Sequence, residues 1–143
     1  MKHQIKTTID INASPAKVWT IFSDFKNYPK WNPFVASLNG DVKVGEIINI
    51  DLITMKFKPV VLKFDQNDEL RWKGKLFMKG LFDGEHYFQL TKNPDGSTTF
   101  THGENFSGIL VRLLKKKLDT ETKEGFVKMN VALKNEVKNA AQI

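Results

Sequence analysis

The chain has 143 residues, of which 22 are Lys or Arg and 16 are Asp or Glu, giving a formal net charge of +6. This length fits one domain, residues 1–143, which buries enough surface to be stable without a disulfide or a metal. The chain has no Cys, which excludes disulfides, thiolate metal sites and Cys nucleophiles and is compatible with a reducing, cytoplasmic location. No apolar segment has the pattern of a signal peptide or the length of a bilayer span, so we expect no stable membrane insertion.

The basic excess raises the question of a nucleic-acid partner. Only two of the basic residues are Arg, Arg71 and Arg112, although Arg supplies the bidentate contacts that phosphate and base recognition favours. The lysines are scattered along the chain, apart from one run at 115–117. We therefore interpret the charge as a solvated surface and expect no nucleic-acid partner.

The N-terminal segment predicts a strand followed by a helix. Apolar and polar residues alternate over residues 2–11, as in a strand with one buried face. Ser14 is a suitable N-cap, and Pro15 follows it at the first helical position, where its missing N–H costs nothing. The helix then carries an apolar stripe of Val18, Trp19 and Phe22.

A second short helix is expected to be capped by Asp24 and to end by Pro29. The segment 28–35 contains two prolines and several aromatic residues. Because proline disfavours the continuation of a helix, we expect an aromatic loop here.

Residues 36–107 alternate with a period of two and carry several turn signals. Ile48, Ile50 and Leu52 give one such strand pattern, and a strong turn signal lies at 93–97. Strands joined by short turns form an antiparallel meander, here with one apolar and one polar face.

Residues 108–143 have a helical pattern, with a stripe formed by Phe126, Met129, Asn130, Leu133 and Val137. Gly125 interrupts this pattern and predicts a kink. A sheet with one apolar face must be covered, and the C-terminal helix is the one long amphipathic element available. The sequence therefore predicts an α+β helix-grip fold, a curved antiparallel sheet around a long C-terminal helix, with two short helices after the first strand.

Local sequence motifs lead to the same fold. Residues 11–19, 24–34, 81–88 and 125–134 have the sequences INASPAKVW, DFKNYPKWNPF, LFDGEHYF and GFVKMNVALK. They resemble motifs of the START/pollen-allergen-like (SRPBCC) superfamily, in its bacterial polyketide cyclase/dehydrase-like branch. The resemblance implies a cavity for a hydrophobic small molecule. Members include lipid carriers, cyclases and hormone receptors, so the fold alone does not specify an activity.

Three polar residues, His86, His102 and Glu104, share the parity of the face that is expected to be buried. A hairpin centred on Asp95 places His86 opposite Glu104 and Phe88 opposite His102. A slip of one residue would turn these side chains to the other face, so this prediction depends on the register.

Two interpretations of this polar group remain open. His86 or His102 forms a general acid–base pair with Glu104, because the pKa of His lies near neutrality and a carboxylate orients the ring. Alternatively, they form a satisfied polar pair, or polar groups of a pocket that only orient a ligand. Their spacing matches no metal motif and no cofactor motif is present, so we expect neither a metal nor a cofactor.

Several further residues are candidates for the wall of a ligand cavity. Asn130 either binds a ligand carbonyl from the apolar helix stripe or forms a hydrogen bond with a neighbouring residue. The large apolar candidates, each with ordinary core packing as the alternative, are Trp31, Phe34, Trp72, Phe77, Leu81, Phe82, Phe88, Phe100, Phe106, Phe126, Met129 and Leu133.

Two segments are candidates for contact with the surroundings. Residues 79–82 place two apolar side chains beside a glycine, which predicts an entrance flap, unless Leu81 and Phe82 pack back on the domain. Residues 108–118 combine apolar residues with a basic run, and contact with an anionic membrane is one hypothesis. We favour the other interpretation, a helix start with solvated lysines.

These observations support three functional hypotheses. The first is binding of a lipid-like or aromatic, polyketide-like small molecule, by a carrier or sensor. The second is a cyclase or dehydratase that uses the His/Glu pair. The third is a co-chaperone-like interaction domain, which a charged convex face without an apolar cavity would favour. The sequence predicts neither the identity of the ligand nor the oligomeric state.

Overall fold

The fold is described from a computed structural model, which covers residues 2–53, 55–76, 78 and 80–140. Its strands are β1 (Lys2–Ile11), β2 (Val35–Asn39), β3 (Asn49–Leu52), β4 (Lys56–Phe57), β5 (Val60–Asp65), β6 (Glu69–Leu76), β7 (Phe82–Lys92) and β8 (Thr98–Ser107). Its helices are α1 (Pro15–Phe22), the 3₁₀ turn η1 (Phe25–Asn27), α2 (Tyr28–Trp31), α3 (Val111–Lys117), the π-helical segment η2 (Leu118–Thr122) and α4 (Lys123–Ala140). The predictions for Phe77 and Lys79 lie outside the described residues.

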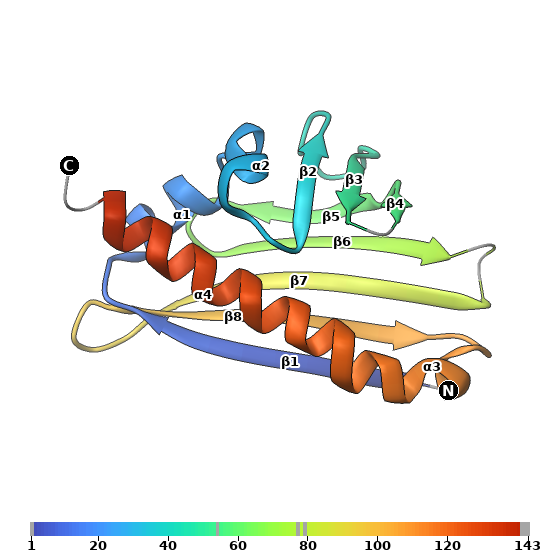
Figure 1. Ribbon diagram of the computed structural model, residues 1–143. Coiled ribbons are helices and arrows are strands. Elements are labelled where there is room, and N and C mark those ends of the chain that lie inside the picture. Colours follow the sequence, from blue (N-terminus) through green and yellow to red (C-terminus); the bar gives the residue numbers. More distant parts are fainter. Residues whose placement is uncertain (1, 54, 77, 79, 141–143) are drawn as a thin grey trace.

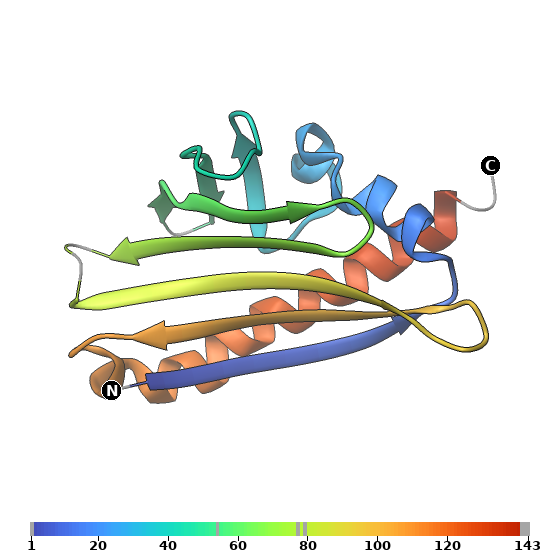
Figure 2. The same ribbon diagram turned by 180° about the vertical axis from the view of Figure 1, so that it is seen from behind.

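The molecule has the predicted α+β helix-grip architecture. Five strands form one antiparallel sheet in the order β1-β8-β7-β6-β5, and α4 runs diagonally across one face of it (Figure 1). From behind, the same sheet lies in front of the helix (Figure 2). The buried helix residues are Phe126, Met129, Asn130, Leu133 and Val137, the stripe that the sequence indicated.

The expected single meander over residues 36–107 is wrong in one respect. Strands β2, β3 and β4 form a separate three-stranded sheet, which stands above β5 and β6 in Figure 1. The pairing of β2 with β3 shifts register between Val35 and Ser37, and one isolated bridge, Ile47 to Val60, links this segment to β5. The irregular pairing lies within the small sheet, where a β-bulge increases the local bend and twist of a strand.

The start of the chain folds as its capping signals predict. Strand β1 buries Ile5, Thr7 and Ile11, partly buries Ile9, and exposes Lys6, Thr8 and Asp10. The hydroxyl of Ser14 accepts a hydrogen bond from the backbone N–H of Lys17 at 3.3 Å and so caps α1.

The segment after α1 departs from the prediction in two ways. Asp24 makes no capping bond to the backbone, and its carboxylate instead accepts from the Asn27 side chain. Residues Tyr28–Trp31 form a short helix rather than a loop, because Pro29 lies in the first turn, where its missing N–H is not needed. The helix ends at Trp31, and the side-chain oxygen of the following residue, Asn32, accepts from the backbone N–H groups of Phe34 and Val35, both at 2.9 Å. These two bonds direct the Phe34 ring toward α4.

Gly125 does not kink the C-terminal helix, because it lies within α4 and the irregular turn is the preceding η2. The glycine instead admits a close neighbour. A Cβ at this position would lie 2.9 Å from Cδ1 of Phe34, tighter than ordinary van der Waals contact. Glycine lowers the helix propensity at this position by about 1 kcal/mol relative to alanine. Because it has no side chain, Phe34 can contact the backbone of the helix here.

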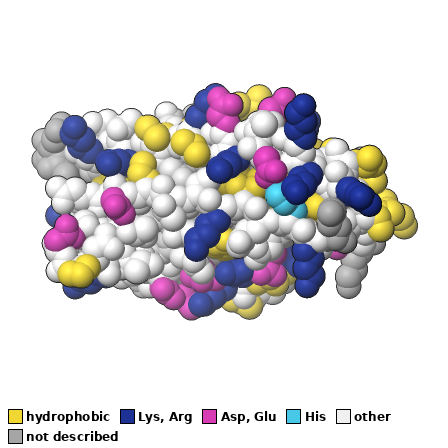
Figure 3. Space-filling model, turned by 90° about the horizontal axis from the view of Figure 1, so that it is seen from below, with side chains coloured by type: hydrophobic (Ala, Val, Ile, Leu, Met, Phe, Trp, Pro, Cys, Tyr) yellow, Lys and Arg dark blue, Asp and Glu magenta, His cyan; other side chains and the backbone are white. Residues whose placement is uncertain are grey.

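The face of the sheet away from α4 is polar. Arg71 donates to the carboxylates of Glu69 at 2.8 Å and of Glu85 at 2.6 Å, and its guanidinium lies 4.8 Å from the centre of the Tyr87 ring. On the face seen in Figure 3, Lys and Arg side chains are interspersed with Asp and Glu. This distribution agrees with the interpretation of the basic charge as solvated surface.

Gly125→Val should lower the free energy of unfolding by about 1–3 kcal/mol, because the larger side chain overlaps with Phe34 in a packed interface. Glu124→Val is the matched control, since Glu124 is exposed on the same turn and should lose less than about 1 kcal/mol. Denaturant unfolding of both variants measures the difference. Equal losses would contradict the proposed role of Gly125.

Candidate functional site

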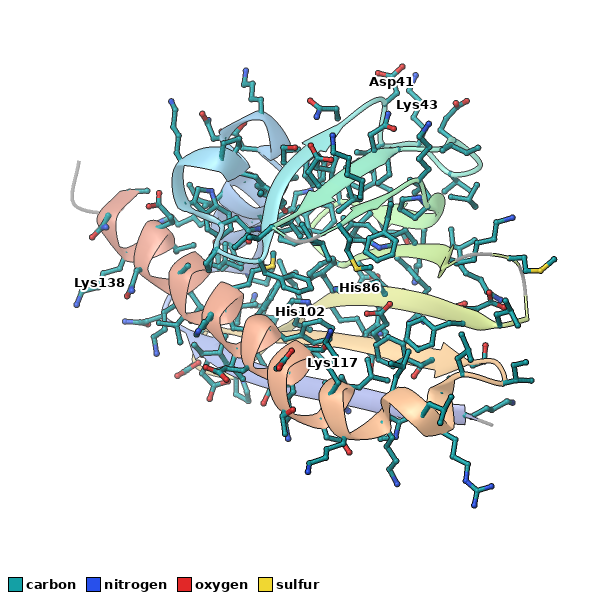
Figure 4. All side chains as sticks on the ribbon, turned by 45° about the vertical axis from the view of Figure 1, so that its right-hand side comes forward. Asp41, Lys43, His86, His102, Lys117 and Lys138 are labelled. Carbon is teal, nitrogen blue, oxygen red and sulfur yellow. The ribbon has the colours of Figure 1, made fainter. Side chains whose placement is uncertain are left out.

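The predicted polar residues meet between the large sheet and the C-terminal helix. The β7–β8 register pairs His86 with Glu104 and Phe88 with His102, which confirms the predicted register. Because these residues have even numbers on two antiparallel strands, their side chains share the face that α4 covers. In Figure 4, His86 and His102 lie together between the strands and the C-terminal helix.

A continuous chain of hydrogen bonds joins these side chains to α4 and β1. Nδ1 of His86 lies 3.2 Å from Oε1 of Glu104, and Nε2 of His86 lies 2.7 Å from Nε2 of His102. Nδ1 of His102 lies 3.0 Å from Oδ1 of Asn130. The amide nitrogen of Asn130 donates to the hydroxyl of Thr7 at 2.9 Å, and this hydroxyl donates to the backbone carbonyl of His102 at 2.8 Å.

The directions of these bonds fix where the protons lie. Because Asn130 donates through its nitrogen to Thr7, its oxygen is an acceptor, and Nδ1 of His102 carries the proton between them. Nε2 of a neutral His102 is then an acceptor, so Nε2 of His86 donates to it. Nδ1 of His86 and Oε1 of Glu104 would both be acceptors unless one proton lies between them. The pair therefore shares one proton, as imidazolium and carboxylate or as imidazole and carboxylic acid.

The environment of His102 keeps this ring neutral. Complete burial lowers the pKa of His102 well below its usual value, and the positive charge of a protonated His86 lowers it further. The hydrogen bonds to Asn130 and to the backbone of Phe126 oppose this shift only in part.

Aromatic rings enclose the two imidazoles. Phe126 of α4 stacks on His102 with ring centres 4.1 Å apart and planes at 11°. Trp72 of β6 and Phe34 each stack on His86, at 5.1 Å and 6.1 Å. These contacts exclude water from the hydrogen-bond chain, which strengthens it electrostatically.

A mainly apolar cavity of about 350 Å³ lies beside this cluster. It is bounded by β6, β7 and β8, by the small sheet, and by the helix around η2. Its lining residues are Phe34, Val35, Ile50, Leu52, Met55, Phe57, Pro59, Trp72, Gly74, Lys75, Phe82, Gly84, His86, Glu104, Phe106, Lys117, Leu118, Glu121, Thr122 and Gly125. The side chains of His86 and Glu104, which are 5% and 17% exposed, form the polar part of the inner wall.

The structure divides the predicted wall residues into two groups. Phe34, Trp72, Phe82, Phe106, His86 and Glu104 line the cavity. The others do not line it: Phe88, Phe100, Phe126, Met129, Leu133, His102 and Asn130 are buried in the core, and Trp31 and Leu81 are partly buried outside the cavity. The even-numbered face of the strands extends over the whole length of α4, so parity selects core and cavity residues together.

Sequence reasoning missed the side of the cavity that faces the small sheet. Ile50, Leu52, Met55 and Phe57 lie on or beside β3 and β4, and Leu118 and Thr122 lie in η2. Alternation at Ile50 and Leu52 did indicate a strand with a buried face. No local signal indicated that this strand would leave the main sheet.

The two segments predicted to contact the surroundings, residues 79–82 and 108–118, each place some apolar side chains at the cavity and others away from it. In the segment that leads into β7, Phe82, the first residue of the strand, lines the cavity and stacks on Phe106 at 5.4 Å, whereas Leu81 does not line the cavity. In the basic segment, Ile109 and Leu113 are 71% and 80% exposed, but Leu118 is buried at the cavity. No helix in the described residues is long and apolar enough to cross a bilayer.

A protein site for a metal ion such as zinc needs at least three donor side chains around one point. No group of three or more His, Asp or Glu side chains in the described part of the chain is arranged to hold a metal ion. The hydrogen-bond chain accounts for the polar atoms of both imidazoles.

His102→Gln should reduce the loss of stability on acidification. A buried neutral His binds its proton only when the chain unfolds, so the free energy of unfolding falls with decreasing pH below about 6.5, by up to about 1.4 kcal/mol per unit. Gln does not take up a proton on unfolding, so the free energy of unfolding of the variant should fall less steeply between pH 6.5 and 5. Chemical denaturation across this range tests the prediction. A slope equal to that of the wild type would contradict the assignment of His102 as a buried neutral ring.

Comparison with known proteins adds an independent observation. Residues 2–138 match the family described as "Polyketide cyclase / dehydrase and lipid transport". A comparison with curated protein sequences finds no match.

Solved structures share the fold at low sequence identity. The Zhui aromatase/cyclase from a Streptomyces species superposes with a TM-score of 0.78 at 10% identity, over 99% of this chain and 96% of that one. A START superfamily protein from Mycobacterium smegmatis gives a TM-score of 0.72 at 22% identity, over 96% and 99%. The di-domain ARO/CYC StfQ of the steffimycin pathway gives 0.79 at 14% identity, and the chain, covered completely, spans 53% of it. On the match over nearly its whole length, the chain belongs to the polyketide cyclase/dehydrase and lipid transport family.

Proposed function

We propose that the protein binds a compact, largely apolar small molecule, lipid-like or aromatic, in the cavity beside His86 and Glu104, as a carrier or sensor. The observation that carries this proposal is the cavity of about 350 Å³, with mainly apolar walls and one buried polar pair. Sites for small molecules have this composition, in which a few polar groups orient an otherwise apolar ligand.

The size of the cavity restricts the ligand. A volume of about 350 Å³ is near the lower end of the range of roughly 300–1,000 Å³ for small-molecule sites. It suits a mono- or bicyclic aromatic compound or a short acyl chain better than a long-chain lipid. The family description names both lipid transport and polyketide chemistry, and both kinds of ligand are apolar.

A second candidate function is acid–base catalysis. The specific observation in its favour is the contact at the cavity wall between Nδ1 of His86 and Oε1 of Glu104, 3.2 Å apart, across which the hydrogen-bond chain implies a single shared proton. A carboxylate there can take a proton from a bound carbon acid and return one, with His86 as its partner. His102 and Asn130 lie behind the wall and hold the His86 ring rather than touching a ligand. The aromatase/cyclase among the similar structures supports this candidate by fold alone.

The third hypothesis, a co-chaperone-like interaction domain, gains no support. It was tied to a charged convex face without an apolar cavity. The Glu69–Arg71–Glu85 network does give a charged convex face, but the domain also has an apolar cavity, which this hypothesis did not expect.

Gly74→Phe should weaken the binding of a neutral apolar dye, N-phenyl-1-naphthylamine, by at least about tenfold, a loss of about 1.4 kcal/mol. Gly74 lines the cavity on an extended strand, where a large side chain fits the backbone but occupies the ligand space. Fluorescence titration measures the affinity. Lys73→Phe, which adds the same ring to the exposed face of β6, is the control and should bind like the wild type. Absence of saturable dye binding to the wild-type protein would contradict the binding proposal.

The catalytic candidate predicts exchange of carbon-bound protons. In D₂O, the wild-type protein should accelerate deuterium incorporation next to the carbonyl of 2-tetralone. Glu104→Gln should lower that rate by about 10²–10⁴-fold. The carboxylate removes the proton to give an enolate, and the protonated pair delivers a deuteron back. Proton NMR follows the exchange, with Glu124→Gln on the exposed helix face as control. Dye binding without any acceleration by the wild type would favour the carrier or sensor over the enzyme.

A further inference from the structure

The hydrogen-bond chain leaves one polar atom open toward the cavity. Oε1 of Glu104 faces His86, but within the described residues no group hydrogen-bonds to Oε2 of Glu104. This oxygen lies over the backbone of Gly84, where a Cβ would overlap with it. Both Gly84 and Glu104 line the cavity. The absence of a side chain on Gly84 therefore gives the carboxylate its position.

Every other group of the cluster is already satisfied. His86 uses both ring nitrogens, His102 is held by Asn130, and Asn130 is held by Thr7. A ligand that displaces water from the cavity would leave Oε2 of Glu104 buried without a partner, which costs free energy. The ligand must therefore bring a hydrogen-bond donor to this point.

The charges restrict the kind of donor. The pair of His86 and Glu104 holds one shared proton and is neutral as a unit, so a ligand cation would lack a net counter-charge there. A ligand anion would likewise meet no net counter-charge there, and a carboxylate anion has no proton to donate to Oε2. Ketone and ether oxygens have no proton to donate and would place lone pairs against Oε2. The remaining choice is a neutral donor, an O–H or an N–H, and of these an O–H forms the shorter hydrogen bond to a carboxylate oxygen.

The surroundings favour an aromatic carrier for this hydroxyl. The walls next to the pair are the rings of Phe34, Trp72 and Phe106. The charged lining residues Lys75, Lys117 and Glu121 are exposed and so mark the rim. The inner end of the cavity thus combines flat apolar surfaces with one acceptor.

We propose that the cavity takes a compact hydroxylated aromatic compound, phenol-like and hydroxyl end first, with its O–H donating to Oε2 of Glu104. This assignment rests on the proposed binding function and names the chemical class of its ligand. Gly84 and the His86–His102–Asn130–Thr7 chain act as positioning groups for the carboxylate.

Three bicyclic probes test the assignment: 2-naphthol, its methyl ether 2-methoxynaphthalene, and 2-naphthoate. Calorimetry or dye displacement should show that the wild-type protein binds 2-naphthol at least about tenfold more tightly than the ether, as expected for a hydrogen bond to a charged group. The carboxylate probe should bind more weakly than 2-naphthol. Because the naphthol and the ether share the same rings, the difference reports on the O–H.

Variants locate the acceptor. Glu104→Leu should bind the two neutral probes with equal affinity, whereas Glu124→Leu, the same change on the exposed face of α4, should keep the preference. If Glu104→Leu fails to fold, as circular dichroism would reveal, Gly84→Ala provides the second measurement. Its methyl group displaces the flexible carboxylate and should reduce the preference while both neutral probes still bind.

The outcomes separate this inference from the function on which it rests. Equal binding of 2-naphthol and its ether by the wild type would overturn the inference and leave apolar binding intact. Tighter binding of 2-naphthoate than of 2-naphthol would also overturn the inference, because it would indicate that the lysines at the rim bind an anionic ligand. A preference that survives in both Glu104→Leu and Gly84→Ala would overturn the assignment to Glu104. Failure of every apolar probe, including the dye, would reject the proposed function itself.

Discussion

The pairing of β7 with β8 places His86 directly across from Glu104 and one step diagonal to His102, and the polar centre of the molecule depends on this register. The side-chain period of a strand is two, so a slip of one residue would move both histidines to the convex face. In the observed register they lie under α4, in contact with aromatic rings, where water does not compete for their hydrogen bonds. The hairpin turn at 93–97 thus determines the chemistry of a site far from it along the strands.

Burial makes the hydrogen-bond chain directional. An exposed histidine can exchange tautomers freely, but His102 is fully buried and must satisfy Asn130 on one side and His86 on the other. Thr7 closes the chain by returning a hydrogen bond to the His102 backbone. The consequence appears at the far end, where His86 and Glu104 share a single proton at the cavity wall. Thr7 of β1 and Asn130 of α4 do not line the cavity, but through His102 they determine where the protons lie on His86 and Glu104, which do.

Two departures from regular structure create the space for a ligand. The small sheet of β2, β3 and β4 leaves the large sheet, and η2 widens the helix turn opposite to it. The cavity lies between them, while the tight contact of Phe34 with Gly125 closes the region toward the core. A regular sheet gripping a regular helix would bury the same residues without this gap. The apolar core and the cavity are thus made from one continuous face, divided by local irregularities.

Much of this architecture is determined by the sequence alone. Alternation along β1, β7 and β8, the Ser14 cap and the stripe from Phe126 to Val137 are local patterns, since strand and helix periods act over a few residues. The turn at 93–97 even determined the partner of His86. The separate small sheet, the helical turn at Pro29 and the division of the aromatic residues between core and cavity were decided only by the tertiary structure. These features depend on which surfaces meet across the fold, and residues distant in the sequence, such as Phe34 and Gly125, carry no local signal of their contact.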